Sequence, residues 1–203
     1  MRTPPVGGDS SLDDTPDRPV PSEGNTAMNS ILRGVRPLDY VLAAVMTALG
    51  VVLMVANMQG SDDGTRIDST SWVMIPVFAV ATVPILFRRR NLWAVLGVTA
   101  AAFAVHDVAF DWVIRCGAGL PLAFALAYSV GRLMTDRQQS YGGLAAVIGI
   151  QLLVLVRDSA AGLEILPFTA VISVAFWGAG LYVQQRSHRS VAATDAARVE
   201  TFA

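Results

Sequence analysis

The sequence has few of the residues from which most catalytic and metal centres are built. It contains one cysteine, Cys116, two histidines and no lysine in 203 residues, and only 15% of its residues are charged. A single cysteine excludes an internal disulfide and a multi-cysteine metal site. A typical soluble domain carries about 25% charged residues. The low charge, with 53% hydrophobic residues and a mean hydropathy of +0.50, is typical of a membrane protein.

The hydrophobic residues are collected into long runs. Each run has 16 to 20 residues, which as a helix extends roughly 24–30 Å and is close to the thickness of a hydrocarbon core. The runs lack the polar alternation of a membrane β-barrel. We therefore expect an all-α, polytopic helical bundle with about six transmembrane helices, at residues 39–58, 71–87, 92–110, 118–134, 141–156 and 165–183.

Composition divides the chain into three parts. Residues 1–36 are rich in Pro, Gly, Ser and Asp and poor in hydrophobic residues, which predicts a disordered cytoplasmic tail. Residues 37–183 form the transmembrane domain. Residues 184–203 lack Gly and Pro, so they either continue the last helix into the cytoplasm or form a frayed polar tail.

The distribution of arginine predicts the orientation in the membrane. If the N-terminus is cytoplasmic, twelve arginines fall in inner segments and three, Arg66, Arg115 and Arg157, in outer loops. This imbalance favours a multi-pass protein of the inner or plasma membrane with both termini in the cytoplasm. The triplet Arg88, Arg89 and Arg90 lies in a loop of about four residues, so we interpret it as a topology anchor. Contact with acidic lipid or a cytoplasmic partner is the alternative.

The middles of the apolar runs contain essentially no ionisable residues. Such groups usually mark ion, proton or substrate pathways, so a coupled transporter and an intramembrane hydrolase are both disfavoured. Gln151 is the clearest polar side chain at depth, and we expect it to make an interhelical polar contact rather than to bind a ligand. No cofactor and no metal site is indicated.

The most polar outer segment is His106-Asp-Val-Ala-Phe-Asp-Trp-Val-Ile-Arg-Cys116. If it is helical, Asp107, Asp111 and Arg115 share one face and Asp111 can pair with Arg115. The plain interpretation is a solvated helix end. The functional interpretation is an outer sensing cluster. In it, His106 either titrates near physiological pH or joins Asp107 and Asp111 around a cation.

Three residues have a structural and a functional interpretation each. Pro76 and Pro84 lie in the second run, where they predict a kinked helix. The kink either serves only helix packing or acts as a hinge. Cys116 is either a small apolar filler or a reactive thiol, and it could also bridge two copies of the chain.

Several segments resemble a known family. Together they cover roughly residues 31–195 and are similar to the membrane-embedded sensor region of bacterial sensor histidine kinases: Arg36-Pro-Leu-Asp-Tyr40, Pro84-Ile-Leu-Phe-Arg-Arg-Arg-Asn-Leu-Trp93, Tyr128-Ser-Val-Gly-Arg132 and Gly180-Leu-Tyr-Val183. In that family the last membrane helix leads into a phosphoacceptor helix and an ATP-binding domain. Neither motif occurs in this sequence, and His188 lacks the phosphoacceptor setting, so we expect no enzymatic activity unless the chain is a fragment of a kinase.

The resemblance implies a non-catalytic sensory or regulatory membrane module of a two-component system. Its partners would be membrane lipid, a histidine kinase or response regulator, and a second copy of the chain in a homodimer. The near-zero net charge of −1 predicts no nucleic-acid partner. A structural or interaction subunit of a larger membrane complex is the alternative, and a small transporter or channel is the third class.

Overall fold

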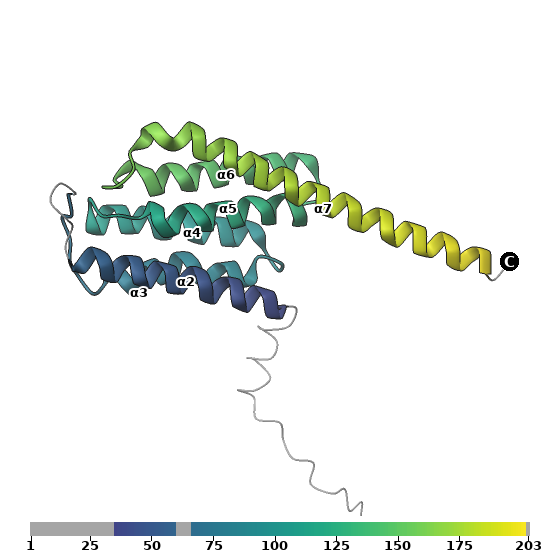
Figure 1. The fold of residues 1–203 in the computed structure, drawn as a ribbon, viewed down its shortest axis with the longest axis horizontal. Coiled ribbons are helices and arrows are strands. Elements are labelled where there is room, and N and C mark those ends of the chain that lie inside the picture. Colours follow the sequence, from purple (N-terminus) through teal and green to yellow (C-terminus); the bar gives the residue numbers. More distant parts are fainter. Residues whose placement is uncertain (1–34, 60–65, 202–203) are drawn as a thin grey trace, which may run out of the picture. The chain divides into compact units, whose positions relative to one another are not determined.

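The computed structural model describes residues 35–59 and 66–201, with side chains up to residue 189. The prediction of a disordered tail at residues 1–36 therefore falls almost wholly outside the described residues. In the described part, all named elements are helical: α2 (Pro37–Met58), α3 (Met74–Thr82), the 3₁₀ helix η1 (Val83–Phe87), α4 (Leu92–Phe110), α5 (Cys116–Leu133), α6 (Arg137–Val156), the 3₁₀ helix η2 (Leu163–Ile165) and α7 (Leu166–Thr201). The helices from α2 to α7 form a bundle (Figure 1).

The predicted helical membrane fold is confirmed. Five helical segments are long and apolar enough to cross a membrane: α2, α4, α5, α6 and Leu163–Arg189, which comprises η2 and the first part of α7. The second predicted run forms a shorter apolar helix, Met74–Phe87, because the helix begins at Met74 rather than at residue 71. Within it the chain changes from α to 3₁₀ geometry at Val83. Pro84 lies at this change, where it removes a backbone donor that an α-helix would use. Pro76 falls in the first turn of α3, where no donor is lost.

Helix starts follow local sequence signals. Pro37 occupies the first position of α2, and Asn91 and Asp136 cap α4 and α6 by accepting hydrogen bonds from Ala94 N (3.0 Å) and Gln139 N (2.9 Å). These residue types satisfy the otherwise unpaired N–H groups of a first turn. The start of α5 has no such local cap and depends on a distant residue.

Helix α5 lies at the centre of the core. Leu122, Ala123, Leu126, Ala127 and Val130 along it are all fully buried. Phe78 of α3 packs edge-on against Phe103 of α4, with 5.6 Å between ring centroids. By contrast, α2 and α7 present many exposed apolar side chains, as expected of helices that face lipid.

Helices α5 and α7 cross with their backbones in contact. A methyl group on Gly131 would overlap the carbonyl of Trp177, and one on Gly180 would overlap the carbonyl of Tyr128. Only glycine permits this approach, which is the packing that membrane helices use in place of a hydrophobic driving force. Gly97 and Gly149, which also fit small-residue spacings, have no atom within 4 Å of an added methyl group.

Helix α7 is the longest element. Its 36 residues correspond to about 54 Å, nearly twice the hydrocarbon thickness. The helix runs along the bundle and continues past the ends of its neighbours, at the end where α2 begins (Figure 1). The sequence left a choice between helix and frayed tail for residues 184–203, and the backbone is helical to Thr201.

Candidate functional site

The buried charged residues of the described chain gather into two clusters at opposite ends of α4. The Arg115 cluster comprises His106, Asp107, Asp111, Arg115, Arg157 and Asp158, and the Asp39 cluster comprises Arg36, Asp39, Arg88, Arg89 and Ser129. The 19 residues of α4 separate the clusters by about 28 Å. Each therefore lies near one edge of the apolar region.

The Arg115 cluster depends on a reversal of the chain after α4. The helix ends at Phe110, and Asp111 has φ 50° and ψ −128°, in the left-handed half of backbone space that side chains other than glycine rarely adopt. The continuous helix required for side-chain pairing of Asp111 with Arg115 is therefore not formed, and that prediction is wrong. Instead the Arg115 side chain folds back onto α4.

Arg115 is completely buried and its guanidinium is surrounded by acceptors. Nη2 donates to the carbonyls of Asp111 (2.5 Å) and His106 (3.3 Å), and Nη1 donates to the carbonyl of Arg157 (2.8 Å). Burial lowers the pKa of the guanidinium from its usual value, while the charges of Asp107 and Asp158 act to raise it. A buried charge is tolerated only with such pairing and hydrogen bonding.

His106 and Asp107 meet the same guanidinium nitrogen. Nε of Arg115 donates to Nδ1 of His106 (3.0 Å) and lies 3.1 Å from Oδ1 of Asp107. Because Nδ1 accepts, the ring proton belongs on Nε2, which has no hydrogen-bond partner in the described part of the chain. The sequence allowed a bound cation among His106, Asp107 and Asp111, and here the chain's own guanidinium stands between the first two.

Asp111 and Arg157 form the exposed rim of the cluster. Their side chains are 50% and 45% exposed, with 3.3 Å between Oδ1 and Nη1. Arg157 also donates to the carbonyl of Asp107 (3.2 Å). An ion pair this exposed contributes little, so the stability of the cluster depends on its buried members.

Asp158 supplies the missing cap of α5. Its Oδ2 accepts from the backbone N–H groups of Arg115 and Cys116 (2.6 Å each), and its Oδ1 accepts from Ala160 and Ala161 (2.9 and 2.8 Å). A carboxylate at a helix N-terminus is favoured by the unpaired donors and by the helix dipole. Asp158 was not identified from the sequence. Its local sequence indicates only a turn, and it lies 43 residues from Arg115.

The cluster also reaches α2. Asn57 Nδ2 donates to the carbonyl of Ile114 (2.9 Å), and Asn57 Oδ1 accepts from Ile114 N (3.3 Å). Residues of α2, α4, α5 and the loop after α6 are thus joined within one hydrogen-bonded assembly. Cys116 is half-buried at the first position of α5 and is a free cysteine.

The Asp39 cluster contains two members of the arginine triplet. Asp39 is fully buried and accepts from Arg88 Nε and Nη2 (3.0 and 2.8 Å), Arg89 Nε (2.9 Å) and Arg36 N (3.0 Å). Arg88 also donates to Oγ of Ser129 on α5 (3.0 Å). The triplet therefore ties α2, the loop after η1 and α5 together. An acid in the first turn of an apolar run, on the same predicted side of the membrane as a basic loop, is the signal that could have identified Asp39.

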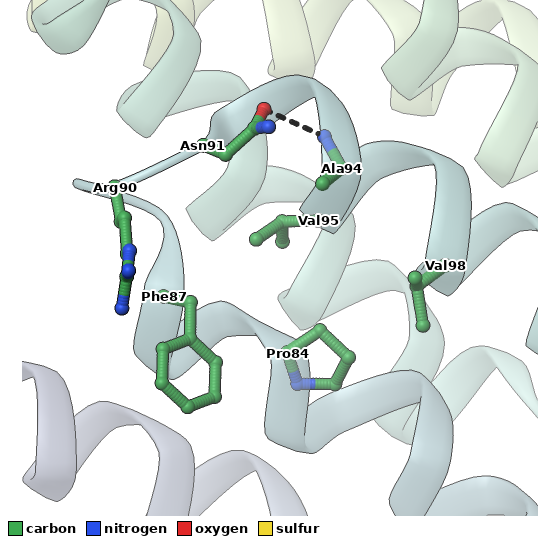
Figure 2. Close-up of a pocket in the computed structure, with 7 residues that line it drawn as sticks. All are labelled: Pro84, Phe87, Arg90, Asn91, Ala94, Val95 and Val98. Carbon is green, nitrogen blue, oxygen red and sulfur yellow. Dashed lines mark hydrogen bonds between the residues drawn. The ribbon is translucent and has the colours of Figure 1, made fainter. Parts of the chain in front are cut away.

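The third member, Arg90, lies elsewhere. It lines a pocket of about 320 Å³ between η1 and α4, whose other walls are mainly apolar. Figure 2 shows Arg90 beside Phe87, with Asn91 at the turn into α4 and its hydrogen bond to Ala94. The three consecutive arginines thus have different surroundings.

Two polar contacts join α7 to α6. Gln151 Nε2 donates to Oγ of Ser173 (2.9 Å) and to the carbonyl of Thr169 (3.3 Å), so the residue makes an interhelical contact. Trp177 Nε1 donates to Oγ of Ser140 (2.8 Å). Together with the glycine crossing on α5, these bonds fix α7 along the bundle.

These features define a multi-pass helical membrane protein with a buried ionic cluster at each end and one helix that extends beyond the bundle. Among the residues described, no group of three or more His, Cys, Asp or Glu side chains could hold a metal ion. No protein-family model, no curated protein and no solved structure matches the chain.

Proposed function

We propose that the chain is a membrane sensory or regulatory module in which α7 is the output helix. The observation that carries this proposal is the continuity of α7, which packs along the bundle and then continues as helix to Thr201. A helix can transmit a shift or rotation over its whole length only if it is unbroken. The resemblance to the sensor regions of histidine kinases supports the same assignment.

The packing offers a mechanical route between the two ends of the bundle. Asp158 holds the start of α5 within the Arg115 cluster, and the other end of α5 contacts α7 at Gly131 and Gly180. A change in the Arg115 cluster would move α5 and, through this contact, α7. Such coupling requires two discrete packings of the bundle that the stimulus distinguishes.

The proposal includes an orientation. In this orientation both termini are in the cytoplasm of a bacterial cell and the Arg115 cluster is at the outer face of the inner membrane; the arginine imbalance supports it. In this arrangement the extension of α7 reaches a cytoplasmic partner, a histidine kinase or response regulator of a two-component system. A homodimer would place two output helices side by side.

A chimera tests the output role. The chain is fused after Thr201 to the dimerising and ATP-binding domains of a histidine kinase, with zero to seven alanines inserted at the junction. We expect autophosphorylation in membrane vesicles to oscillate with the insertion length at a helical period, because each residue rotates the output by about 100°. We also expect Asp158→Asn to shift this pattern.

Kinase activity that is the same for every insertion and for Asp158→Asn would contradict the proposal. Recovery of the native chain from crosslinked membranes in a stable complex with unrelated membrane proteins would favour the structural-subunit alternative.

A further inference from the structure

The surface between α2 and α5 carries a groove that the proposed signalling role does not use. Its volume is about 440 Å³, within the range of small-ligand sites of roughly 300–1,000 Å³. One wall is a stripe of α2 side chains, Leu38, Val41, Leu42 and Val45, and the other is formed by Ala125, Tyr128 and Arg132 of α5. Phe176 of α7 also lines it.

The groove runs parallel to the helix axes. The α2 residues are spaced by three or four positions over one face, and so are those of α5, so each wall extends about 10 Å along its helix. Leu38, Val41 and Val45 are 71%, 58% and 53% exposed. They face away from the core, toward the surroundings of the bundle.

Charge is confined to one end of this groove. Arg132 near the end of α5 and Arg88 both line it, and both lie at the end where α2 begins. The groove is thus apolar along its length and cationic at its mouth. An amphiphile aligned with the helices, with its head at the membrane edge, matches this division.

The cationic end has an excess of positive charge. Arg88 and Arg89 share the single carboxylate of Asp39, whereas no carboxylate of the described residues pairs with Arg132. Taken together, the side chains of Arg88, Arg89, Arg132 and Asp39 carry a charge of +2. Arg132 makes one hydrogen bond among the described residues, to the hydroxyl of Tyr128 (3.2 Å), so most of its five donors are available to a ligand.

We propose that this groove binds an anionic phospholipid of the bilayer, with an acyl chain against the α2 stripe and the phosphate at Arg132 and Arg88. Guanidinium groups pair well with phosphate oxygens, and basic pockets between membrane helices are suited to anionic headgroups. The site is independent of sensing and of which membrane face the arginines occupy.

Two matched pairs of variants test the site. Arg132→Gln removes the headgroup partner, and Arg137→Gln removes an exposed arginine that does not line the groove. Val45→Trp fills the groove, and Val52→Trp places the same side chain on an exposed position two turns further along α2. All four changes leave the core side chains in place.

Binding is measured by native mass spectrometry of the delipidated full chain in a neutral detergent, titrated with dioleoylphosphatidylglycerol or dioleoylphosphatidylcholine. We expect the wild type to prefer the anionic lipid. Arg132→Gln should weaken its binding about fivefold, the effect of one arginine near a membrane surface, and Arg137→Gln less than twofold. Val45→Trp should abolish the preference, and Val52→Trp should retain it.

Equal binding of the two lipids by the wild type would overturn the proposal, as would equal losses in the two arginine variants. Unchanged binding of the anionic lipid by Val45→Trp would show that the lipid does not bind in this groove. A second copy of the chain as occupant would appear as a dimer that Val45→Trp disrupts without loss of lipid, which would also overturn it. Circular dichroism and monodisperse elution establish that each variant is folded.

Discussion

At the scale of single residues, the two buried aspartates that pair with arginine differ in how well they are compensated. Asp39 accepts four hydrogen bonds, two of them from Arg88. Asp107 has one ion pair with Arg115 and no hydrogen-bond partner for either oxygen among the described residues. Because an incompletely hydrogen-bonded buried charge is costly, the Arg115 cluster is the less stable of the two.

Arg115→Gln should destabilise the bundle by about 3–5 kcal/mol, because it leaves Asp107 buried without its counter-charge. The exposed Arg157→Gln should cost less than about 1 kcal/mol. The unfolding free energy in detergent, followed by tryptophan fluorescence against sodium dodecyl sulfate, measures both. Adding Asp107→Asn to Arg115→Gln should recover part of the loss. A double variant as unstable as the sum of the single ones would show that the two side chains are not coupled.

At the scale of helices, sequence spacing could not distinguish glycines that pack from glycines that face open space. Gly97 and Gly149 satisfy the small-residue pattern, yet an added methyl group meets nothing there. Gly131 and Gly180 form the α5–α7 crossing. Which glycines lie at a crossing depends on which faces of the two helices meet, and α5 and α7 are far apart in the sequence. Caps behave differently: Asn91 and Asp136 act on their own helices, and so are visible in the sequence, whereas Asp158 acts across 42 residues on Cys116.

Gly131→Ala and Gly180→Ala should each destabilise the bundle by about 1–3 kcal/mol, because the added methyl group meets backbone that cannot rotate away. Gly97→Ala and Gly149→Ala are matched controls, and should be neutral or slightly stabilising since alanine favours helix. Thermal unfolding of the detergent-solubilised protein compares the four. Equal melting temperatures across the set would contradict the glycine crossing.

At the scale of the whole molecule, the helical membrane architecture was predictable because it depends on run length and composition. The runs at residues 92–110 and 141–156 correspond to α4 and α6, the latter four residues longer at its start. The 3₁₀ segment Val83–Phe87 in the second helix was not predicted, because a switch to 3₁₀ geometry leaves hydropathy unchanged. The fold-back of Arg115 depends on the backbone of Asp111, which no periodicity reveals.

The orientation of the molecule is a separate prediction. Replacing Arg88, Arg89 and Arg90 together by Asn should scramble insertion, because it removes three of the twelve inner arginines. Alkaline-phosphatase fusions after residue 90 should become active in a substantial fraction of molecules.

Asp39→Asn is the control for the triplet. It weakens the ion pairs of Arg88 and Arg89 but keeps every positive charge, so the fusions should stay inactive as in the parent. Inactive fusions in the triplet variant would show that these arginines do not set the orientation. Active fusions in Asp39→Asn would show that the ion pairs, rather than the charges, matter.

The remote cap of α5 has a consequence for biogenesis. The chain emerges from the ribosome in order, so the start of α5 emerges before Asp158, which lies 42 residues after Cys116. Until α6 has been inserted, the first amides of α5 and the guanidinium of Arg115 lack that carboxylate. We therefore expect nascent α5 to reach its final position only as part of a hairpin with α6. In a chain truncated before Asp158, this segment would be exposed to quality-control proteases.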